Sequence, residues 1–491
     1  MSIHFCSLCY CNHMSLTRKI ALNSAVQIAG KVVSTGFGLL VIGMLTRSLG
    51  PAAFGRYAVA LAFLQVFGVL VDLGLYIVLL QKLSSDEANA ESWASTAFTL
   101  RLITASGFLV LAPLIALLTH YPGDVKQAIA IATISTFAVT MNQVLVGIFQ
   151  KALQMHRVAI AELVGRVVLL VSTYLVVHSH PTVPWVMVTV AAGSVANVLL
   201  SFILSRGIVR IRLHLDREKV RTIFREGWPV ALSIAFNLVY FKADTLILAR
   251  MRPDAEVGLY ASAYKVLEVL TTFPAMFAGL LTPLLASAHA SQDKLRFQQV
   301  LQRAVDTIGL LAIPLAVGTG FVAIQVMRLV GGSAYVAAAP ALTVLMVATA
   351  CIFFGNLFAN AVVAVGAQRR MLWAYATVAV VTLTGYFIAI PRAGIQGAAW
   401  MTLVSELAIA LTGIILILRV TQAKLHWHRL ARTLLACVPM VILLMLTPTL
   451  PLFTRLFLGV AGYVVGLFLT RTFPTAIVRE LFTRQAYANR D

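Results

Sequence analysis

The sequence has few charged residues, and acidic residues are the scarcest among them. Only 11% of the 491 residues are charged, against about a quarter in a typical soluble protein, and 38 Lys and Arg face 18 Asp and Glu. Hydrophobic residues make up 60% and the mean hydropathy is +0.90. The apolar runs are about 20 residues long and continuous, which favours membrane-spanning helices over the alternating strands of a barrel. The composition therefore predicts an all-α polytopic membrane protein.

Cysteines and catalytic motifs are also scarce. Of the five cysteines, Cys351 and Cys437 lie in apolar runs, where packing explains them, and Cys6, Cys9 and Cys11 lie in the N-terminal tail. Short tails of this kind more commonly hold nothing than zinc, so we expect no metal site. The chain has no Gly-x-x-x-x-Gly-Lys-Ser/Thr phosphate loop, no His-Glu-x-x-His and no Gly-x-Ser-x-Gly. These absences, together with the short loops, predict a protein that is not an enzyme and carries no cofactor.

The apolar runs predict about 14 transmembrane helices, and their loops carry an asymmetric charge. With the N-terminus inside, most of the Lys and Arg residues fall in the inside loops and tails. This is the positive-inside pattern, which places both termini in the cytoplasm and explains the excess of basic residues without a nucleic-acid partner. The predicted spans are 20–45, 57–80, 94–118, 127–149, 159–178, 185–205, 228–249, 258–284, 303–326, 340–364, 372–390, 398–418, 433–449 and 456–470.

The chain repeats itself in two halves. An offset of 203 residues pairs Leu45 with Leu248, Gly55 with Gly258, and several neighbours of each. Two matching halves of six spans predict lobes related by a pseudo-two-fold axis along the membrane normal, with substrate bound between them. The predicted domains are a tail (1–19), an N-terminal six-helix lobe (20–205), a basic cytoplasmic connector (206–227), a C-terminal six-helix lobe (228–419), two extra C-terminal helices (420–470) and a second tail (471–491).

Polar side chains inside the first predicted spans mark a candidate site. Asn23, Gln27 and Lys31 recur at steps of four in the first span and share one face, and Asp72 lies in the second. An ionisable side chain near mid-membrane costs roughly 2.5–3.5 kcal/mol, so such groups face protein or a water-filled cavity. In the fifth span Arg166 stands four residues after Glu162, a spacing that allows these two to pair on one helix. Snorkelling to the interface explains Arg101 in the third span about as well as function does.

The second half carries charges at comparable positions. Lys242 and Asp244 lie in the seventh span, Lys265 and Glu268 lie three residues apart in the eighth, and Glu406 lies in the twelfth. Cations in a cavity suit an anionic substrate, and carboxylates suit a coupling cation, H⁺ or Na⁺. We therefore expect substrate binding at Lys31, Gln27, Asn23, Lys242, Lys265 and Arg166, and ion coupling at Asp72, Asp244 and Glu268. The alternative interpretation is that fixed pairs of lysine and aspartate only hold helices together.

Several stretches in order along the chain carry a family resemblance. The first begins with Asn23-Ser24-Ala25 and continues through the turn from Leu45 to Tyr57. The other stretches are Gly331-Gly332-Ser333-Ala334-Tyr335, Gly366-Ala367-Gln368-Arg369-Arg370 and Gly394-Ile395-Gln396-Gly397-Ala398-Ala399. In this order they are similar to Wzx-type polysaccharide flippases of the multidrug/oligosaccharidyl-lipid/polysaccharide exporter superfamily.

The resemblance implies a flippase of the bacterial inner membrane. Its substrate would be an undecaprenyl-diphosphate-linked oligosaccharide, moved by alternating access to the outer leaflet for exopolysaccharide, capsule or O-antigen synthesis, with a proton or sodium gradient as the energy source. Membrane lipid, a polysaccharide polymerase and a chain-length regulator would be its partners. The alternatives are a multidrug or small-solute antiporter of the same superfamily and a non-transporting scaffold. The intramembrane charges argue against the scaffold, which needs no charged cavity.

Overall fold

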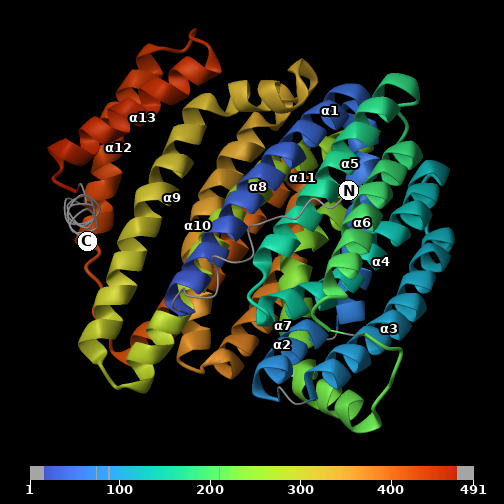
Figure 1. Cartoon of the computed structure of the whole chain (residues 1–491). Coiled ribbons are helices and arrows are strands. Elements are labelled where there is room, and N and C mark those ends of the chain that lie inside the picture. Colours follow the sequence, from blue (N-terminus) through green and yellow to red (C-terminus); the bar gives the residue numbers. More distant parts are fainter. Residues whose placement is uncertain (1–15, 73, 87–88, 210, 473–491) are drawn as a thin grey trace, which may run out of the picture. The chain divides into compact units, whose positions relative to one another are not determined.

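A computed structural model describes residues 16–472 except 73, 87–88 and 210. Throughout these residues the regular structure is helical, without strands, which confirms the predicted all-α polytopic fold (Figure 1). Eleven of the described helices are long and apolar enough to cross a membrane. The helices are α1 (Leu16–Asp72), α2 (Leu75–Ser85), α3 (Ala90–Leu118), α4 (Gly123–Lys151), α5 (Met155–Ser179), α6 (Val183–Ser205), α7 (Arg217–Met251), α8 (Asp254–Ala290), α9 (Lys294–Gly331), the 3-10 helix η2 (Ser333–Ala338), α10 (Ala339–Ala364), α11 (Gln368–Thr421), α12 (His428–Leu446) and α13 (Leu452–Leu469).

Helices α1 and α11 each contain two helical segments. They are 57 and 54 residues long, so an unbroken helix would run to about 80 Å, far beyond the ~30 Å of hydrocarbon. Gly50 in α1 has φ 70° and Gly394 in α11 has φ 53°, in the left-handed region that favours glycine. Both glycines lie in predicted turns between spans. The predicted number of fourteen spans stays a prediction.

The second predicted span, 57–80, is wrong as a single helix. Helix α1 ends at Asp72 and α2 begins at Leu75, after Gly74 with φ 73°. A Cβ on Gly74 would also lie 2.5 Å from the carbonyl oxygen of Gly227. Two features therefore require glycine at this position, the left-handed backbone angle and the close approach of α7. Its position in an apolar run gave no sign of this break.

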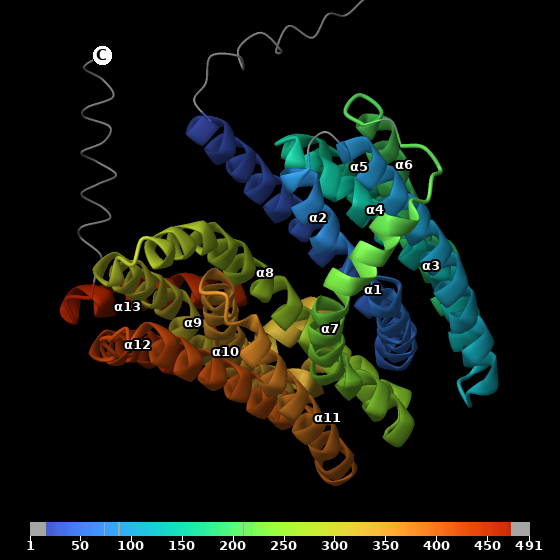
Figure 2. The same cartoon turned by 90° about the horizontal axis from the view of Figure 1, so that it is seen from below.

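The chain divides into two compact units. The first holds Met1–Ser262, Val330–Ala334 and Ala379–Ala398, and the second holds Ala263–Leu329, Tyr335–Val378 and Ala399–Asp491. In the first unit α4 packs on α3 and α6, and α5 packs on α1 and α6, as two perpendicular views show (Figures 1 and 2). The predicted division into two six-helix lobes with a connector stays a prediction.

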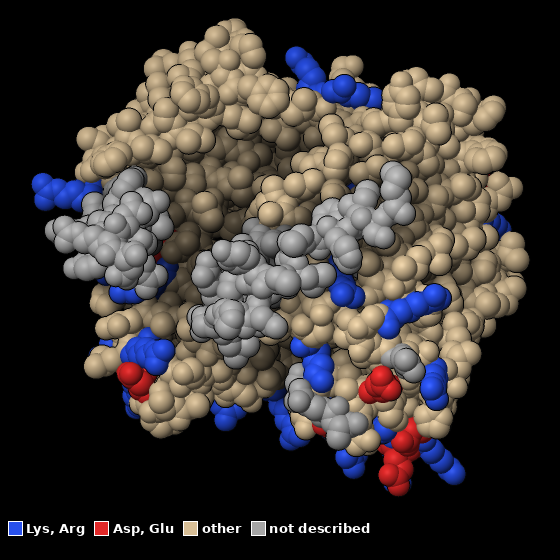
Figure 3. All heavy atoms as spheres, viewed as in Figure 1, with Lys and Arg blue, Asp and Glu red and all other residues tan. Residues whose placement is uncertain are grey.

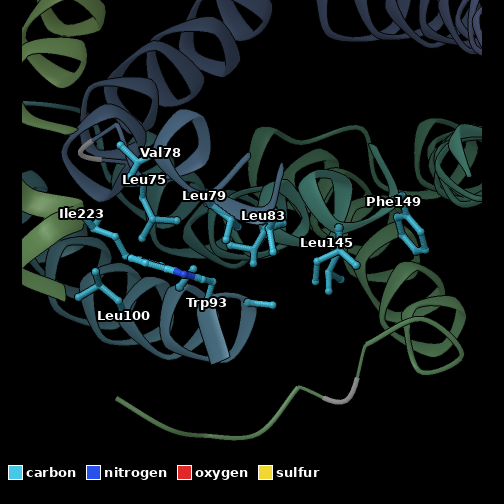
Figure 4. Packing of buried hydrophobic residues seen from close by; sticks show 13 residues of the cluster. Leu75, Val78, Leu79, Leu83, Trp93, Leu100, Leu145, Phe149 and Ile223 are labelled. Carbon is cyan, nitrogen blue, oxygen red and sulfur yellow. The ribbon is translucent and has the colours of Figure 1, made fainter. Parts of the chain in front are cut away.

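An apolar cluster ties α2 to its neighbours in the first unit. Leu79 and Leu83 of α2 belong to one buried cluster with Trp93 of α3, Phe149 of α4 and Ile223 of α7 (Figure 4). In the second unit α12 and α13 pack together and α12 packs on α9 through a smaller cluster. On the molecular face drawn in Figure 3 charged side chains are few, and most of them lie toward the lower edge.

Candidate functional site

Lys31, Glu162 and Arg166 form a polar group between α1 and α5. The ammonium of Lys31 donates to the Glu162 carboxylate at 3.0 Å, and the two side chains are 38% and 23% exposed. Glu162 thus pairs with Lys31 on another helix, and the expectation that it pairs with Arg166 is wrong. Arg166 lies one turn further along α5 with a terminal nitrogen beside Gly38 of α1, and it has no carboxylate partner within the described part of the chain. The predicted residues Lys31 and Arg166 therefore both lie at the interface of α1 and α5, where Glu162 pairs with Lys31 alone.

Asp72 pairs with Arg101 at the break between α1 and α2. A terminal nitrogen of Arg101 lies 2.5 Å from the Asp72 carboxylate, and the Arg101 side chain is fully buried. Thr104, one turn along α3, donates to the carbonyl of Val71, one of the carbonyls left without a helical partner at the end of α1. Snorkelling therefore does not explain Arg101, because its guanidinium points into protein and not toward the membrane surface. The ion pair anchors the broken helix to α3.

Asp244 lies in a fully buried network in α7. It accepts a hydrogen bond from the hydroxyl of Tyr260 in α8 at 2.6 Å and others from the amide and hydroxyl of Thr245. Lys242 is half-buried two residues earlier and acts on Asp244 electrostatically. Asp244 therefore joins α7 to α8 and has no exposed surface in this conformation.

Lys265 and Glu268 form an ion pair within α8, in the second unit. Their side chains are 2.6 Å apart and about a quarter exposed. The three-residue spacing on one helix allows this pair. The side chains of Asn23 and Gln27, the remaining predicted substrate-binding residues, lie outside the described residues.

A reciprocal backbone contact joins α1 to α8 inside the first unit. A Cβ on Gly55 would overlap the carbonyl oxygen of Asp254, and one on Gly258 would overlap the carbonyl oxygen of Pro51. The offset of 203 residues pairs Pro51 with Asp254 as well as Gly55 with Gly258. The approach of Gly55 to Asp254 is thus the repeat equivalent of the approach of Gly258 to Pro51. A two-fold relation between the repeats requires such a reciprocal pair of contacts. Arg56 adds an ion pair to Asp124 at 2.6 Å and lies 3.6 Å from Asp254.

Charged side chains also join α2, α3 and α7. Lys82 of α2 pairs with Glu226 of α7 at 2.9 Å, and the ammonium groups of Lys82 and Lys219 lie over the ring of Trp93. The indole N–H of Trp93 donates to Asp86 and lowers the pKa of that carboxyl.

The start of α7 is capped by an aspartate. The Asp216 carboxylate accepts from the backbone amides of Lys219 and Glu218, and these hydrogen bonds lower its pKa. The predicted connector is therefore fixed to α2 and α3 by specific contacts.

Comparison of the sequence with known proteins identifies a family. Residues 44–340 match the family model described as "Polysaccharide biosynthesis protein". The Escherichia coli K12 lipopolysaccharide biosynthesis protein WzxC is 24% identical over 339 residues, which cover 68% of each chain. The probable low-salt glycan biosynthesis flippase Agl15 of Haloferax volcanii is 21% identical over 333 residues, 66% of this chain and 68% of that protein.

Solved structures share the fold. The lipid II flippase MurJ in an inward closed conformation superimposes with a TM-score of 0.75 at 13% identity, covering 91% of this chain and 99% of that one. An inward-facing multidrug resistance MATE transporter of the MOP superfamily gives a TM-score of 0.63 at 15% identity, covering 81% and 98%. The multi-pass membrane fold is therefore that of MOP superfamily transporters. Because the family model spans more than half of the sequence, the chain belongs to the polysaccharide biosynthesis protein family.

Proposed function

We propose that this protein is a flippase that moves an undecaprenyl-diphosphate-linked oligosaccharide across the bacterial inner membrane by alternating access. The observation that carries the proposal is a set of intramembrane charges in a member of a polysaccharide biosynthesis family. WzxC and Agl15 are named for polysaccharide or glycan biosynthesis, and Agl15 is named as a flippase. The product would serve exopolysaccharide, capsule or O-antigen synthesis. The protein acts as a transporter and not as an enzyme.

Lys31 and Arg166 are the residues that we assign to the anionic part of the substrate. Lys31 pairs with Glu162 and Arg166 has no carboxylate partner among the described residues, so this interface carries an excess positive charge that a diphosphate or an acidic sugar can neutralise. Lys31 is 38% exposed, which leaves its ammonium accessible. Lys242 and Lys265 are the candidates of the second half of the sequence, and Asn23 and Gln27 extend the face of Lys31.

Energy would come from a proton or sodium gradient, since the chain has no phosphate loop. Both termini would lie in the cytoplasm, with membrane lipid, a polysaccharide polymerase and a chain-length regulator as partners. Reporter fusions test this topology: those after Arg225 and Arg370 should read as cytoplasmic, and one at Gly332 as periplasmic. A periplasmic signal after Arg225 would reverse the orientation.

Gene deletion and complementation test the function. Deletion should stop polymer export and leave lipid-linked repeat units in the cytoplasmic leaflet, and the wild-type gene should restore export. Lys31→Ala and Lys242→Ala should fail to restore it at normal protein levels, whereas the exposed control Lys294→Ala should succeed. Polymer export that survives deletion, together with a new sensitivity to toxic cations, would instead favour the multidrug antiporter.

A further inference from the structure

Glu406 differs from the other acidic residues that lie inside the predicted membrane spans. Within the part of the chain that the structure describes, each of the others has a hydrogen-bonding or cationic partner, and Glu406 has neither. Its side chain is nevertheless buried, at 5% exposure. The partnered carboxylates are Asp72 with Arg101, Glu162 with Lys31, Asp244 with Tyr260, Glu268 with Lys265 and Asp306 with Arg429.

The position of Glu406 is deep in the second segment of α11. It lies 12 residues after the Gly394 turn and 15 before the end of the helix at Thr421, which is about 20 Å from either end. Neither end of the helix is within reach of a glutamate side chain, so this carboxyl group cannot reach the membrane surface by snorkelling.

Helix α10 packs along the same face of α11. A Cβ on Gly355 of α10 would touch Ala410, and one on Gly413 would touch Phe358. Glu406 lies one turn before Ala410 on this face. The titratable groups near enough to interact with it electrostatically are the Cys351 thiol of α10 and the Tyr375 phenol of the first segment of α11. Both are neutral side chains at physiological pH, so neither offsets a negative charge on the carboxylate.

A carboxylate buried without a cation is costly, because it loses its hydration and gains no Coulombic partner in return. The neutral, proton-carrying carboxyl group avoids most of this cost. A change of conformation that admits water would remove the constraint and release the proton. We propose that Glu406 is a proton-binding group of the transport cycle, which takes up a proton when it becomes buried and releases it when it becomes hydrated.

This inference rests on the proposed transport function and adds a chemical role to one residue. The proton would bind one carboxylate oxygen from the outer side and leave to the cytoplasm, while the substrate moves outward. Asp72, Glu162 and Glu268 are less suited to this role, since each is already paired with a cation that stabilises its charged form.

Infrared difference spectroscopy of the purified, substrate-free protein in lipid tests proton binding directly. A pH titration of the wild type should show the carbonyl stretch of a protonated carboxyl group. Glu406→Gln should remove this band, and Glu406→Asp should keep it at a shifted frequency. Asp306→Asn, which alters a carboxylate paired with Arg429, should leave it unchanged. A band that persists in Glu406→Gln, or no such band in the wild type, would overturn the proposal.

A transport measurement completes the test. In proteoliposomes that hold the native lipid-linked oligosaccharide, a pH gradient should stimulate flipping by the wild type, and Glu406→Gln should flip only at the rate seen without a gradient. Gradient stimulation that survives in Glu406→Gln would overturn the coupling role. Absence of flipping by the wild type would instead count against the proposed function, and the infrared result would stand independently of it.

Discussion

The two halves of the sequence share one equivalent backbone contact and differ in how they arrange their intramembrane charges. They are equivalent at the contact between Gly55 and Gly258. The absence of a side chain on Gly55 leaves room for the carbonyl oxygen of Asp254, and the absence of one on Gly258 leaves room for that of Pro51, the repeat equivalent of Asp254. Their ion pairs are not equivalent. In the first half Lys31 pairs with Glu162 on a different helix, whereas in the second Lys265 pairs with a residue three positions away on its own helix.

This difference separates two uses of charge in a membrane protein. A pair between helices holds them together and loses its partner when they separate, so it opposes movement. A pair within one helix does not itself join that helix to another. Glu406 is buried and has neither kind of partner among the described residues, so none of these residues offsets a negative charge on it.

Neutralising Asp72 should have the largest effect on stability. Asp72→Asn leaves the fully buried Arg101 guanidinium without its counter-ion, and breaking a buried pair in this way typically costs about 3–5 kcal/mol. Thermal denaturation in detergent should show a large loss of stability. The double variant Asp72→Asn/Arg101→Gln should recover most of it, and Glu218→Gln on the exposed connector should change nothing. An Asp72→Asn variant as stable as the wild type would show that this pair does not anchor α1.

A single methyl group at the reciprocal glycine contact should have the next largest effect. In Gly258→Ala the new Cβ would overlap the Pro51 carbonyl oxygen, and forced overlaps of this kind cost about 1–3 kcal/mol. Gly55→Ala should cost a similar amount because its contact is the repeat equivalent. Gly279→Ala is the matched control, since it lies in α8 with no atom within 4 Å of its Cβ, and it should be neutral or stabilising. Equal stability of Gly258→Ala and Gly279→Ala would contradict a tight contact.

Double-mutant cycles on two ion pairs should show the smallest effects. Both pairs are partly exposed, so coupling energies for stability should be about 1 kcal/mol or less for Lys31–Glu162 and about 0.5 kcal/mol or less for Lys265–Glu268. We expect the larger coupling energy for Lys31–Glu162 because this pair joins two helices, whereas Lys265–Glu268 lies within one. A larger coupling for Lys265–Glu268 would reverse the comparison between the halves.

Features set by local sequence could be predicted. The ends of the long apolar runs predict turns where the structure has Gly50 and Gly394, and the i, i+3 spacing of Lys265 and Glu268 is local enough to allow their contact. Partners from distant segments could not be predicted. Lys31 and Glu162 are 131 residues apart, and no spacing rule relates them. The break at Gly74 was missed because it lies within an apolar run, and the neighbour that leaves no room for a side chain there, Gly227, is on another helix.

Reconstituted flipping of the lipid-linked oligosaccharide is the most direct test of the central claim. Purified protein would be placed in proteoliposomes with undecaprenyl-diphosphate-linked oligosaccharide labelled on its sugar, and the label reaching the opposite leaflet would be followed with a membrane-impermeant quencher. The account predicts that the wild type and Lys294→Ala move the label well above protein-free liposomes and that Lys31→Ala does not. Label movement no faster than in protein-free liposomes, from a wild-type protein shown to be folded, would contradict it.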